Sequence, residues 1–292
     1  MDKQKRTIIQ FCSALLQNAN LTGFAGGTLY RGPVKQFCVP GLNCYSCPGA
    51  LGACPLGSLQ AFLSGRPVVF PFYVLGIVLF FGTLLGRAVC GFLCPFGLIQ
   101  ELLFKIPIPR KKAPTLPGDR WLRKLKYAVL LVFVIALPLA LENIPAFCKW
   151  LCPVGALEGS IPLTLLSGSD VVFSKGWLYF WKLALLTLVL LASAAVFRPF
   201  CRYLCPLGAF YGCMNRVSIY RASIDVSRCT GCGSCAAVCP MQTNPLGQTN
   251  GAECIRCGAC EKTCPSGALH FTFHLPLLPE SACKDTQPPN HF

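Results

Sequence analysis

Histidine is scarce in this sequence, and that scarcity limits the kinds of redox centre that the chain can carry. The three histidines among 292 residues, His270, His274 and His291, all lie near the C-terminus, outside any long apolar run. The motif C-x-x-C-H is also absent. We therefore expect neither covalently attached c-type haem nor haem b held by two histidines inside a membrane.

Charged residues are also few, and acidic residues are the rarest of them. Charged residues make up 13% of the chain and hydrophobic residues 53%, and 26 basic residues stand against 11 acidic ones. So apolar a composition is typical of a protein with several membrane spans. The basic residues gather beside apolar runs without an aromatic-basic pattern, which argues against nucleic-acid binding. Paired catalytic carboxylates, a nucleophile triad and a phosphate loop are missing, so we expect no stand-alone enzyme.

Four apolar stretches predict membrane-spanning helices, since a span needs about 20 mostly apolar residues. They cover residues 7–27, 67–89, 126–147 and 176–197. Gln and Asn residues interrupt the first, which we interpret as an uncleaved anchor, with a signal peptide as the alternative. Segments 87–126 and 198–292 hold nine and eight Lys or Arg residues, whereas segments 28–66 and 148–176 hold three and two. This bias predicts that both termini face the cytoplasm. Lys182 and Glu142 lie near span ends, where their charged heads are expected to snorkel to the membrane surface.

One short motif recurs where each predicted span ends. The stretches CGFLCPFG, CKWLCPVG and CRYLCPLG begin at Cys90, Cys148 and Cys201, and a looser copy, CPGALGACPLG, begins at Cys47. If successive spans cross the membrane in opposite directions, the copies that end at Cys94 and Cys205 meet on the cytoplasmic face. The copies that end at Cys54 and Cys152 meet on the outer face. The chain therefore reads as a four-fold repeat of helix and Cys-Pro turn.

Cysteine is abundant, with 21 residues, and the C-terminal cysteines follow a pattern typical of iron-sulfur proteins. CTGCGSCAAVCP and CIRCGACEKTCP are two copies of C-x2-C-x2-C-x3-C-P, in which the fourth cysteine binds the cluster of the other run. We expect one [4Fe–4S] cluster on Cys229, Cys232, Cys235 and Cys264, and a second on Cys254, Cys257, Cys260 and Cys239. Zinc favours paired C-x2-C groups with longer intervals and fits this spacing poorly.

Four more cysteines lie on the predicted cytoplasmic face, and they are enough for a third cluster. They are Cys90, Cys94, Cys201 and Cys205. Two alternatives remain open, namely a redox dithiol and free cysteines packed at helix ends. The repeated C-x-x-x-C-P spacing favours the cluster, because packing alone does not require it.

Six cysteines on the outer face leave the ligands of a fourth cluster undecided. They are Cys38, Cys44, Cys47, Cys54, Cys148 and Cys152. The repeat groups Cys148, Cys152 and Cys54 with one of the other three. A local cluster within 38–54 is the rival, with Cys148 and Cys152 as a dithiol, and CYSC also has the spacing of a redox disulfide. Cys12, Cys213 and Cys283 belong to no group.

Apolar spans ending in C-x-x-x-C-P, followed by a two-cluster ferredoxin tail, resemble the NapH/NosR-type 4Fe-4S membrane polyferredoxins over roughly residues 67–270. The resemblance implies a membrane component that passes electrons between quinol or cytoplasmic donors and extracytoplasmic redox proteins. This sequence departs from the family pattern by its cysteine-rich segment 38–54 and by the pair at 148–152. It also lacks the Ser/Thr-Gly-Ala-Thr type of motif that carries FMN in flavin-bearing relatives, so covalent FMN is not expected.

These observations predict a membrane all-α protein of about four transmembrane helices with a C-terminal α+β domain like a bacterial two-[4Fe–4S] ferredoxin. The predicted parts are 1–66, an N-terminal helix and outer cysteine-rich segment; 67–216, the membrane domain; 217–275, the ferredoxin-like domain; and 276–292, a tail.

The predicted function is electron transfer in the cell membrane, as a carrier or an oxidoreductase subunit. A cytoplasmic ferredoxin- or flavodoxin-like donor would load the tail, and an extracytoplasmic flavoprotein or thioredoxin-like protein would accept the electrons. Membrane lipid is a further expected partner, and nucleic acid is not. A quinone-linked oxidoreductase subunit is one alternative. A membrane protein that senses redox state or helps to mature a metalloenzyme is another.

Overall fold

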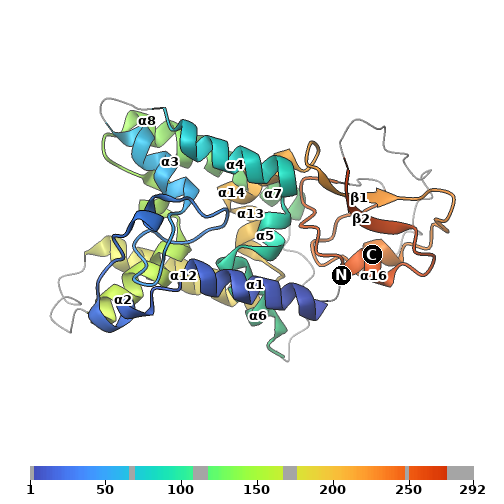
Figure 1. Cartoon of the computed structure of the whole chain (residues 1–292), viewed down its shortest axis with the longest axis horizontal. Helices are drawn as coiled ribbons and strands as arrows, with labels where there is room; N and C mark the ends of the chain where they lie inside the picture. The colour runs from blue at the N-terminus through green and yellow to red at the C-terminus, as the bar shows by residue number, and fades with distance from the viewer. Residues whose placement is uncertain (1–2, 66–69, 108–117, 167–175, 247–249, 275–292) are drawn as a thin grey trace.

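The computed structural model describes residues 3–65, 70–107, 118–166, 176–246 and 250–274, and most of them are helical (Figure 1). The first helices are α1 (Lys3–Gln17), α2 (Leu21–Gly26), the 3-10 helix η1 (Pro33–Gln36), α3 (Pro55–Ser64), α4 (Phe72–Leu85), α5 (Ala88–Phe92) and α6 (Pro95–Lys105). They are followed by α7 (Asp119–Val129), the π-helix η2 (Leu130–Ala136), α8 (Leu137–Ala140), α9 (Ala146–Trp150), the π-helix η3 (Gly155–Ser160), α10 (Ile161–Leu166), α12 (Trp177–Ala195), α13 (Pro199–Tyr203) and α14 (Pro206–Met214). The tail holds β1 (Tyr220–Ile224), α15 (Ser234–Ala237), α16 (Ala259–Thr263) and β2 (Leu269–Phe273).

The Cys-Pro pairs explain why so many helices are short. Cys94 lies between α5 and α6 with an extended backbone (φ −84°, ψ 116°), and Cys205 lies between α13 and α14 in the same conformation (φ −70°, ψ 113°). Proline disfavours a helical conformation in the residue before it and suits the first position of a new helix. Each pair therefore ends one helix, begins another and leaves the cysteine at the bend between them.

One of the four predicted spans is a single long apolar helix in the part of the chain that the structure describes. This helix, α12, has 19 residues. Helix α4 is apolar but has 14 residues, and at about 1.5 Å per residue it is shorter than the roughly 30 Å hydrocarbon core. The helical run from α7 through η2 to α8 is continuous but changes its hydrogen-bonding pattern along its length.

The predicted first span, 7–27, is two helices with a break between them. Helix α1 ends at Gln17 and α2 begins at Leu21. The side chain of Asn18 donates to the Ala14 carbonyl at 3.1 Å, and that of Asn20 donates to the Pro48 carbonyl at 2.8 Å. Asparagine side chains that bond to nearby backbone compete with helical hydrogen bonds, which accounts for the break.

Two hydrophobic cores divide the molecule. The larger one includes Cys90, Cys94, Cys152 and Cys205, and the smaller one surrounds Cys235 in the tail. In the tail, β1 and β2 pair antiparallel, with Tyr220 opposite Phe273 and Ile224 opposite Leu269. Figure 1 shows this sheet and α16 at one end of the molecule and α2, α3 and α8 toward the other. The described part of the chain is mostly helical, with a two-stranded sheet and two short helices in the tail, in keeping with the predicted helical domain and α+β tail.

Candidate iron-sulfur sites

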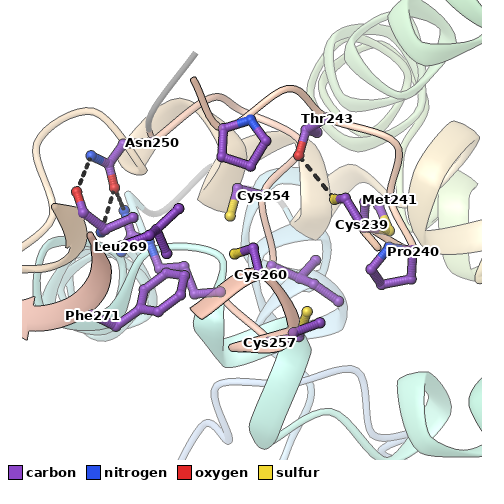
Figure 2. Close-up of a pocket in the computed structure, with 15 residues that line it drawn as sticks. Cys239, Pro240, Met241, Thr243, Asn250, Cys254, Cys257, Cys260, Leu269 and Phe271 are labelled. Carbon is purple, nitrogen blue, oxygen red and sulfur yellow. Dashed lines mark hydrogen bonds between the residues drawn. The ribbon is translucent and has the colours of Figure 1, made fainter. Parts of the chain in front are cut away.

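One cavity in the tail is lined by four thiols from both ferredoxin-like runs. Cys254, Cys257 and Cys260 come from the second run, and Cys239 is the last cysteine of the first. Figure 2 shows the four sulfur atoms around one space, with the Cys239 thiol 3.2 Å from the Thr243 hydroxyl. The sequence spacing predicts this same set of four.

A second cavity brings together the remaining tail cysteines. Its lining includes Cys229, Cys232, Cys235 and Cys264. Two of these thiols are close to serine hydroxyls, since Cys232 lies 3.4 Å from Ser234 and Cys264 lies 3.6 Å from Ser266. These hydroxyls lower the pKa of Cys232 and of Cys264, and so favour the thiolate that binds iron.

A glycine follows the second cysteine of each run, and its backbone explains its presence. Gly233 has φ 72° and Gly258 has φ 77°, a left-handed conformation that side chains with a Cβ rarely adopt. Each glycine is the N-cap of the short helix that carries the third cysteine, in α15 or α16. The turn therefore brings the third cysteine back beside the first two.

A third group of thiols lies in the larger core. Burial raises the pKa of Cys94 and of Cys205, and the neighbouring Cys201 and Cys90 raise both further. All four side chains are buried. We call this group, Cys90, Cys94, Cys201 and Cys205, the inner site.

Two buried arginines hold the inner site in a reciprocal arrangement. Arg87, three residues before Cys90, donates to the Cys201 carbonyl at 2.8 Å. Arg198, three residues before Cys201, donates to the Cys90 carbonyl at 2.5 Å. By position alone, both arginines belong to the basic segments 87–126 and 198–292. The shared spacing R-x-x-C-x-x-x-C-P was the signal that could have identified them.

A fourth group of thiols lines a cavity with a volume of about 690 Å³. These thiols are Cys44, Cys54, Cys148 and Cys152, which we call the outer site. Lys182 of α12 lines the same cavity, so its ammonium group faces the thiols and not only the membrane surface. The arrangement supports the grouping based on the repeat, with Cys44 as the fourth member.

The other outer cysteines lie elsewhere. Cys38 is buried with its thiol 3.7 Å from the Ser58 hydroxyl, and Cys47 is buried with its thiol 3.6 Å from the Asn18 side-chain oxygen. Cys12 and Cys213 are exposed, and Cys283 lies outside the described residues. The local cluster of Cys38, Cys44, Cys47 and Cys54 therefore has less support than the outer site.

The glycine of each C-P-x-G motif has a common role at both sites. The backbone N–H groups of Gly57, Gly97, Gly155 and Gly208 each donate to the thiol of the cysteine three residues earlier. For Cys205 and Gly208 the distance is 3.3 Å. Such bonds stabilise a thiolate or a negatively charged cluster sulfur.

The donor sets fit an iron-sulfur cluster. Each of the four groups offers four thiols, the soft ligands that iron-sulfur chemistry uses. Within the described part of the chain, no three His, Cys, Asp or Glu side chains converge on the position of one metal ion. In the two tail groups and at the outer site, the thiols instead line a shared cavity, as suits a cluster whose iron atoms each take one thiolate.

Comparisons with known proteins agree with this chemistry. A model described as a 4Fe-4S binding domain matches residues 67–115, 125–159 and 177–223, and a second with the same description matches 222–243 and 249–270. An uncharacterized protein of Methanocaldococcus jannaschii is 30% identical over 195 residues, which cover 65% of this chain and 73% of the relative. The chain belongs to the NapH/NosR-type 4Fe-4S polyferredoxins.

Two of the named relatives that this polyferredoxin matches are described as ferredoxin-type proteins. The methylamine utilization ferredoxin-type protein MauN of Methylobacillus flagellatus is 30% identical, with 64% of this chain and 60% of MauN covered. The ferredoxin-type protein NapH of Haemophilus influenzae is 28% identical, with 56% and 51% covered. No solved structure matches the chain. The polyferredoxin thus uses [4Fe–4S] clusters and belongs among iron-sulfur electron-transfer proteins.

Proposed function

We propose that this polyferredoxin relays electrons across the cell membrane, from a cytoplasmic ferredoxin- or flavodoxin-like donor to an extracytoplasmic flavoprotein or thioredoxin-like acceptor. Its four cysteine groups would hold four [4Fe–4S] clusters, two in the tail, one at the inner site and one at the outer site. Each cluster, when bound, would take up and release single electrons. The remainder of the chain would position these sites, shield them from solvent and set the distances between them.

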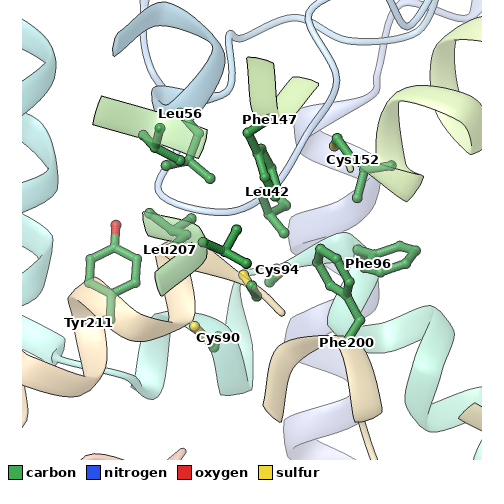
Figure 3. Packing of buried hydrophobic residues seen from close by; sticks show 14 of the residues in the cluster. Leu42, Leu56, Cys90, Cys94, Phe96, Phe147, Cys152, Phe200, Leu207 and Tyr211 are labelled. Carbon is green, nitrogen blue, oxygen red and sulfur yellow. The ribbon is translucent and has the colours of Figure 1, made fainter. Parts of the chain in front are cut away.

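The observation that carries this proposal is that the inner and outer sites share one buried core. Leu42 is 1% exposed, lines the outer cavity and donates its backbone N–H to the thiol of Cys94 at the inner site. Figure 3 shows Leu42 between Cys94 and Phe147, which precedes Cys148 of the outer site. The Tyr211 hydroxyl donates to the Pro40 carbonyl at 3.0 Å and holds this segment in place.

The closeness of the two sites matters for electron transfer across a membrane. A hydrocarbon core is about 30 Å thick, which is too far for one efficient electron-transfer step between its two surfaces. Residues 40–42 enter the core between the two sites, so that a single residue, Leu42, contacts both. The two sites therefore need not be separated by the thickness of the membrane.

The tail is also joined to the inner site. A Cβ placed on Gly91, the residue after Cys90, would lie 2.5 Å from the carbonyl oxygen of Ile255, the residue after Cys254. Asn215 donates to the Cys254 carbonyl at 2.8 Å, and Arg256 donates to the Leu85 carbonyl at 3.0 Å. These contacts favour entry of electrons into the inner site from the tail group of Cys239, Cys254, Cys257 and Cys260.

Membrane placement is part of the proposal, with four crossings and both termini in the cytoplasm. Helix α12 supports it, because this helix is long enough and its apolar side chains face outward, with Leu188 64% and Leu191 68% exposed. Large exposed apolar surface is disfavoured in water and favoured against lipid. Protease accessibility of the tail in sealed vesicles of known orientation would test the placement.

The number of clusters is tested by iron and sulfide analysis of anaerobically purified protein. Four clusters require about sixteen irons per chain, and a Cys148→Ser/Cys152→Ser variant is expected to lose about four. A Cys12→Ser/Cys213→Ser variant, which alters exposed cysteines outside the four groups, is the matched control and should lose none. About eight irons in both the wild-type protein and the first variant would mean that only the two tail groups bind clusters.

The relay itself is tested in proteoliposomes with cytochrome c enclosed and a charged reductant outside. Wild-type protein is expected to reduce the enclosed cytochrome c, and the Cys148→Ser/Cys152→Ser variant to lose most of this activity. Equal rates in the two would contradict a path through the outer site. Sensitivity of the wild-type rate to a quinone analogue would instead favour the quinone-linked alternative.

A further inference from the structure

The sixth residue after each Cys-Pro cysteine is a hydrogen-bonding residue in all four copies. The copies read CPLGSLQ, CPFGLIQ, CPVGALE and CPLGAFY, and these residues are Gln60, Gln100, Glu158 and Tyr211. The position falls on the second turn of the helix that the proline begins, so that its side chain points back toward the start of that helix. A side chain at this position can therefore reach the Cys-Pro turn of the repeat copy that lies opposite.

Gln100 makes this contact at the inner site. Its side-chain oxygen accepts a hydrogen bond from the backbone N–H of Phe200 at 3.2 Å, and its side-chain nitrogen lies 3.1 Å from the thiol sulfur of Cys201. A backbone N–H can only donate, so the amide oxygen must face Phe200 and the NH₂ group must face the sulfur. Gln100 is fully buried, and its orientation is therefore determined by its partners.

Gln60 makes the same two contacts at the outer site. Its side-chain oxygen accepts from the backbone N–H of Phe147 at 2.9 Å, and its nitrogen donates to the thiol of Cys148 at 3.5 Å. It is also fully buried. Gln100 thus holds Cys201, the first cysteine of FCRYLCP, and Gln60 holds Cys148, the first cysteine of FCKWLCP, by the same arrangement of hydrogen bonds.

We propose that Gln60 and Gln100 are matched positioning residues, each orienting one cysteine ligand and raising the reduction potential of one cluster, at the outer and the inner site respectively. This inference rests on the proposed function of the two sites. An N–H donor to a cluster sulfur stabilises the reduced form, which carries more negative charge. Removing the donor therefore lowers the reduction potential of that cluster alone.

Glu158, at the same position in a third copy, also contacts a facing cysteine segment. Its carboxylate accepts from the backbone N–H of Cys44 at 2.7 Å. Glu158 thus holds the segment of Cys44, just as Gln60 holds the segment of Cys148 and Gln100 holds the segment of Cys201. The contact thus selects Cys44 over Cys38 and Cys47 independently of the cavity lining.

Tyr211 shows how the fourth copy differs. Its hydroxyl donates to the Pro40 carbonyl, and among the described residues it makes no hydrogen bond to a cysteine segment of the inner site. The inner site therefore has one sulfur-donating glutamine and the outer site has another. Each glutamine is consequently the matched control for the other.

The test uses full-length protein with its clusters, purified anaerobically, and redox titration followed by electron paramagnetic resonance. Gln100→Glu keeps the oxygen that accepts from Phe200 but replaces the N–H donor, and Gln60→Glu does the same beside Phe147. We expect each variant to retain wild-type iron and to shift one cluster to a lower potential, and the two variants to shift different clusters. Gln100→Leu and Gln60→Leu, which lose both bonds, are expected to show the same shifts.

Several results would overturn the inference. Unchanged potentials with full iron would show that the glutamines set no potential, while the four-cluster proposal would stand. A shift of the same cluster by both glutamate variants would disprove the matched roles. Loss of about four irons in both the glutamate and the leucine variant of one glutamine would show that it only builds the site. If wild-type protein held only about eight irons, the proposed function would itself fail, and this is visible before any variant is compared.

Discussion

The surroundings of each cysteine determine how easily it loses its proton to bind iron. Burial raises the pKa of Cys44 to about 12, with a smaller lowering by the Ser46 backbone, and burial also raises the pKa of Cys54. In the tail site, serine hydroxyls lower the pKa of Cys232 and of Cys264, while burial raises the pKa of Cys235. A thiol must lose its proton to bind iron, so the outer site competes with protons more than this tail site does.

Cluster reconstitution should therefore depend on pH in a site-specific way. As pH falls, thiols of raised pKa are protonated first, so the outer site is expected to lose iron uptake at a higher pH than the site of Cys232 and Cys264. Iron bound by chemically reconstituted protein between pH 6.5 and 8.5 would measure this. The Cys148→Ser/Cys152→Ser variant, which lacks the outer site, should show a weaker dependence. Equal slopes in the two proteins would contradict the assignment.

Among the structural elements, the segment of residues 40–42 is the one that joins the inner and outer sites. A Cβ on Gly41 would lie 3.0 Å from the Cα of Cys94 and 3.3 Å from the Leu93 carbonyl oxygen. Both neighbours are backbone atoms, which cannot rotate away. Glycine is therefore required here by the close approach of the segment to the bend between α5 and α6, and not by its backbone conformation.

Gly41→Ala should consequently push this segment away from Cys94. Overpacking of this kind costs about 1–3 kcal/mol of stability. We expect a lower thermal midpoint, followed by loss of cluster absorbance, and weaker magnetic coupling between the clusters proposed for the inner and outer sites. Gly76→Ala in α4, where an added Cβ meets nothing within 4 Å, is the control and should be neutral or slightly stabilising. Equal midpoints for the two variants would argue against the tight contact.

For the molecule as a whole, docking of the tail on the membrane domain depends on a buried ion cluster. Glu253 of the tail pairs with Arg87 at 2.7 Å and with Lys126, and both cations are fully buried. Burial opposes ionisation of Glu253, but Arg87 and Lys126 more than offset it and lower its pKa to about 2. The carboxylate is therefore charged at neutral pH and joins α7, the start of α5 and the tail.

Glu253→Gln should weaken this docking, because it leaves two buried cations without their carboxylate. Breaking a buried ion pair from one side typically costs about 3–5 kcal/mol. The expected result is a lower thermal midpoint and faster proteolysis between α14 and β1. Glu142→Gln, which changes an exposed carboxylate, is the control. A Glu253→Gln protein as stable as the control would show that the ion cluster is not what holds the tail.

Several features of the candidate sites could be predicted from the sequence, and others could not. The spacing of the tail cysteines predicts the two groups that line the tail cavities, because three members of each group are close in the chain. Spacing could not choose among Cys38, Cys44 and Cys47, since each lies within a few residues of the others and the choice depends on how the loop folds. Chain order gives no sign that Leu42 contacts Cys94, more than fifty residues away.

The sequence by itself determined the local parts of this protein: the cluster-binding runs, the Cys-Pro bends and the glycines that follow them. These depend on backbone sterics and on ligands a few residues apart. Only the tertiary structure decided how the copies of the repeat meet, that Gln60 and Gln100 contact the facing cysteine segments, and that Lys182 lines the outer cavity. Those features depend on contacts between residues distant in the chain, and packing, not spacing, selects such contacts.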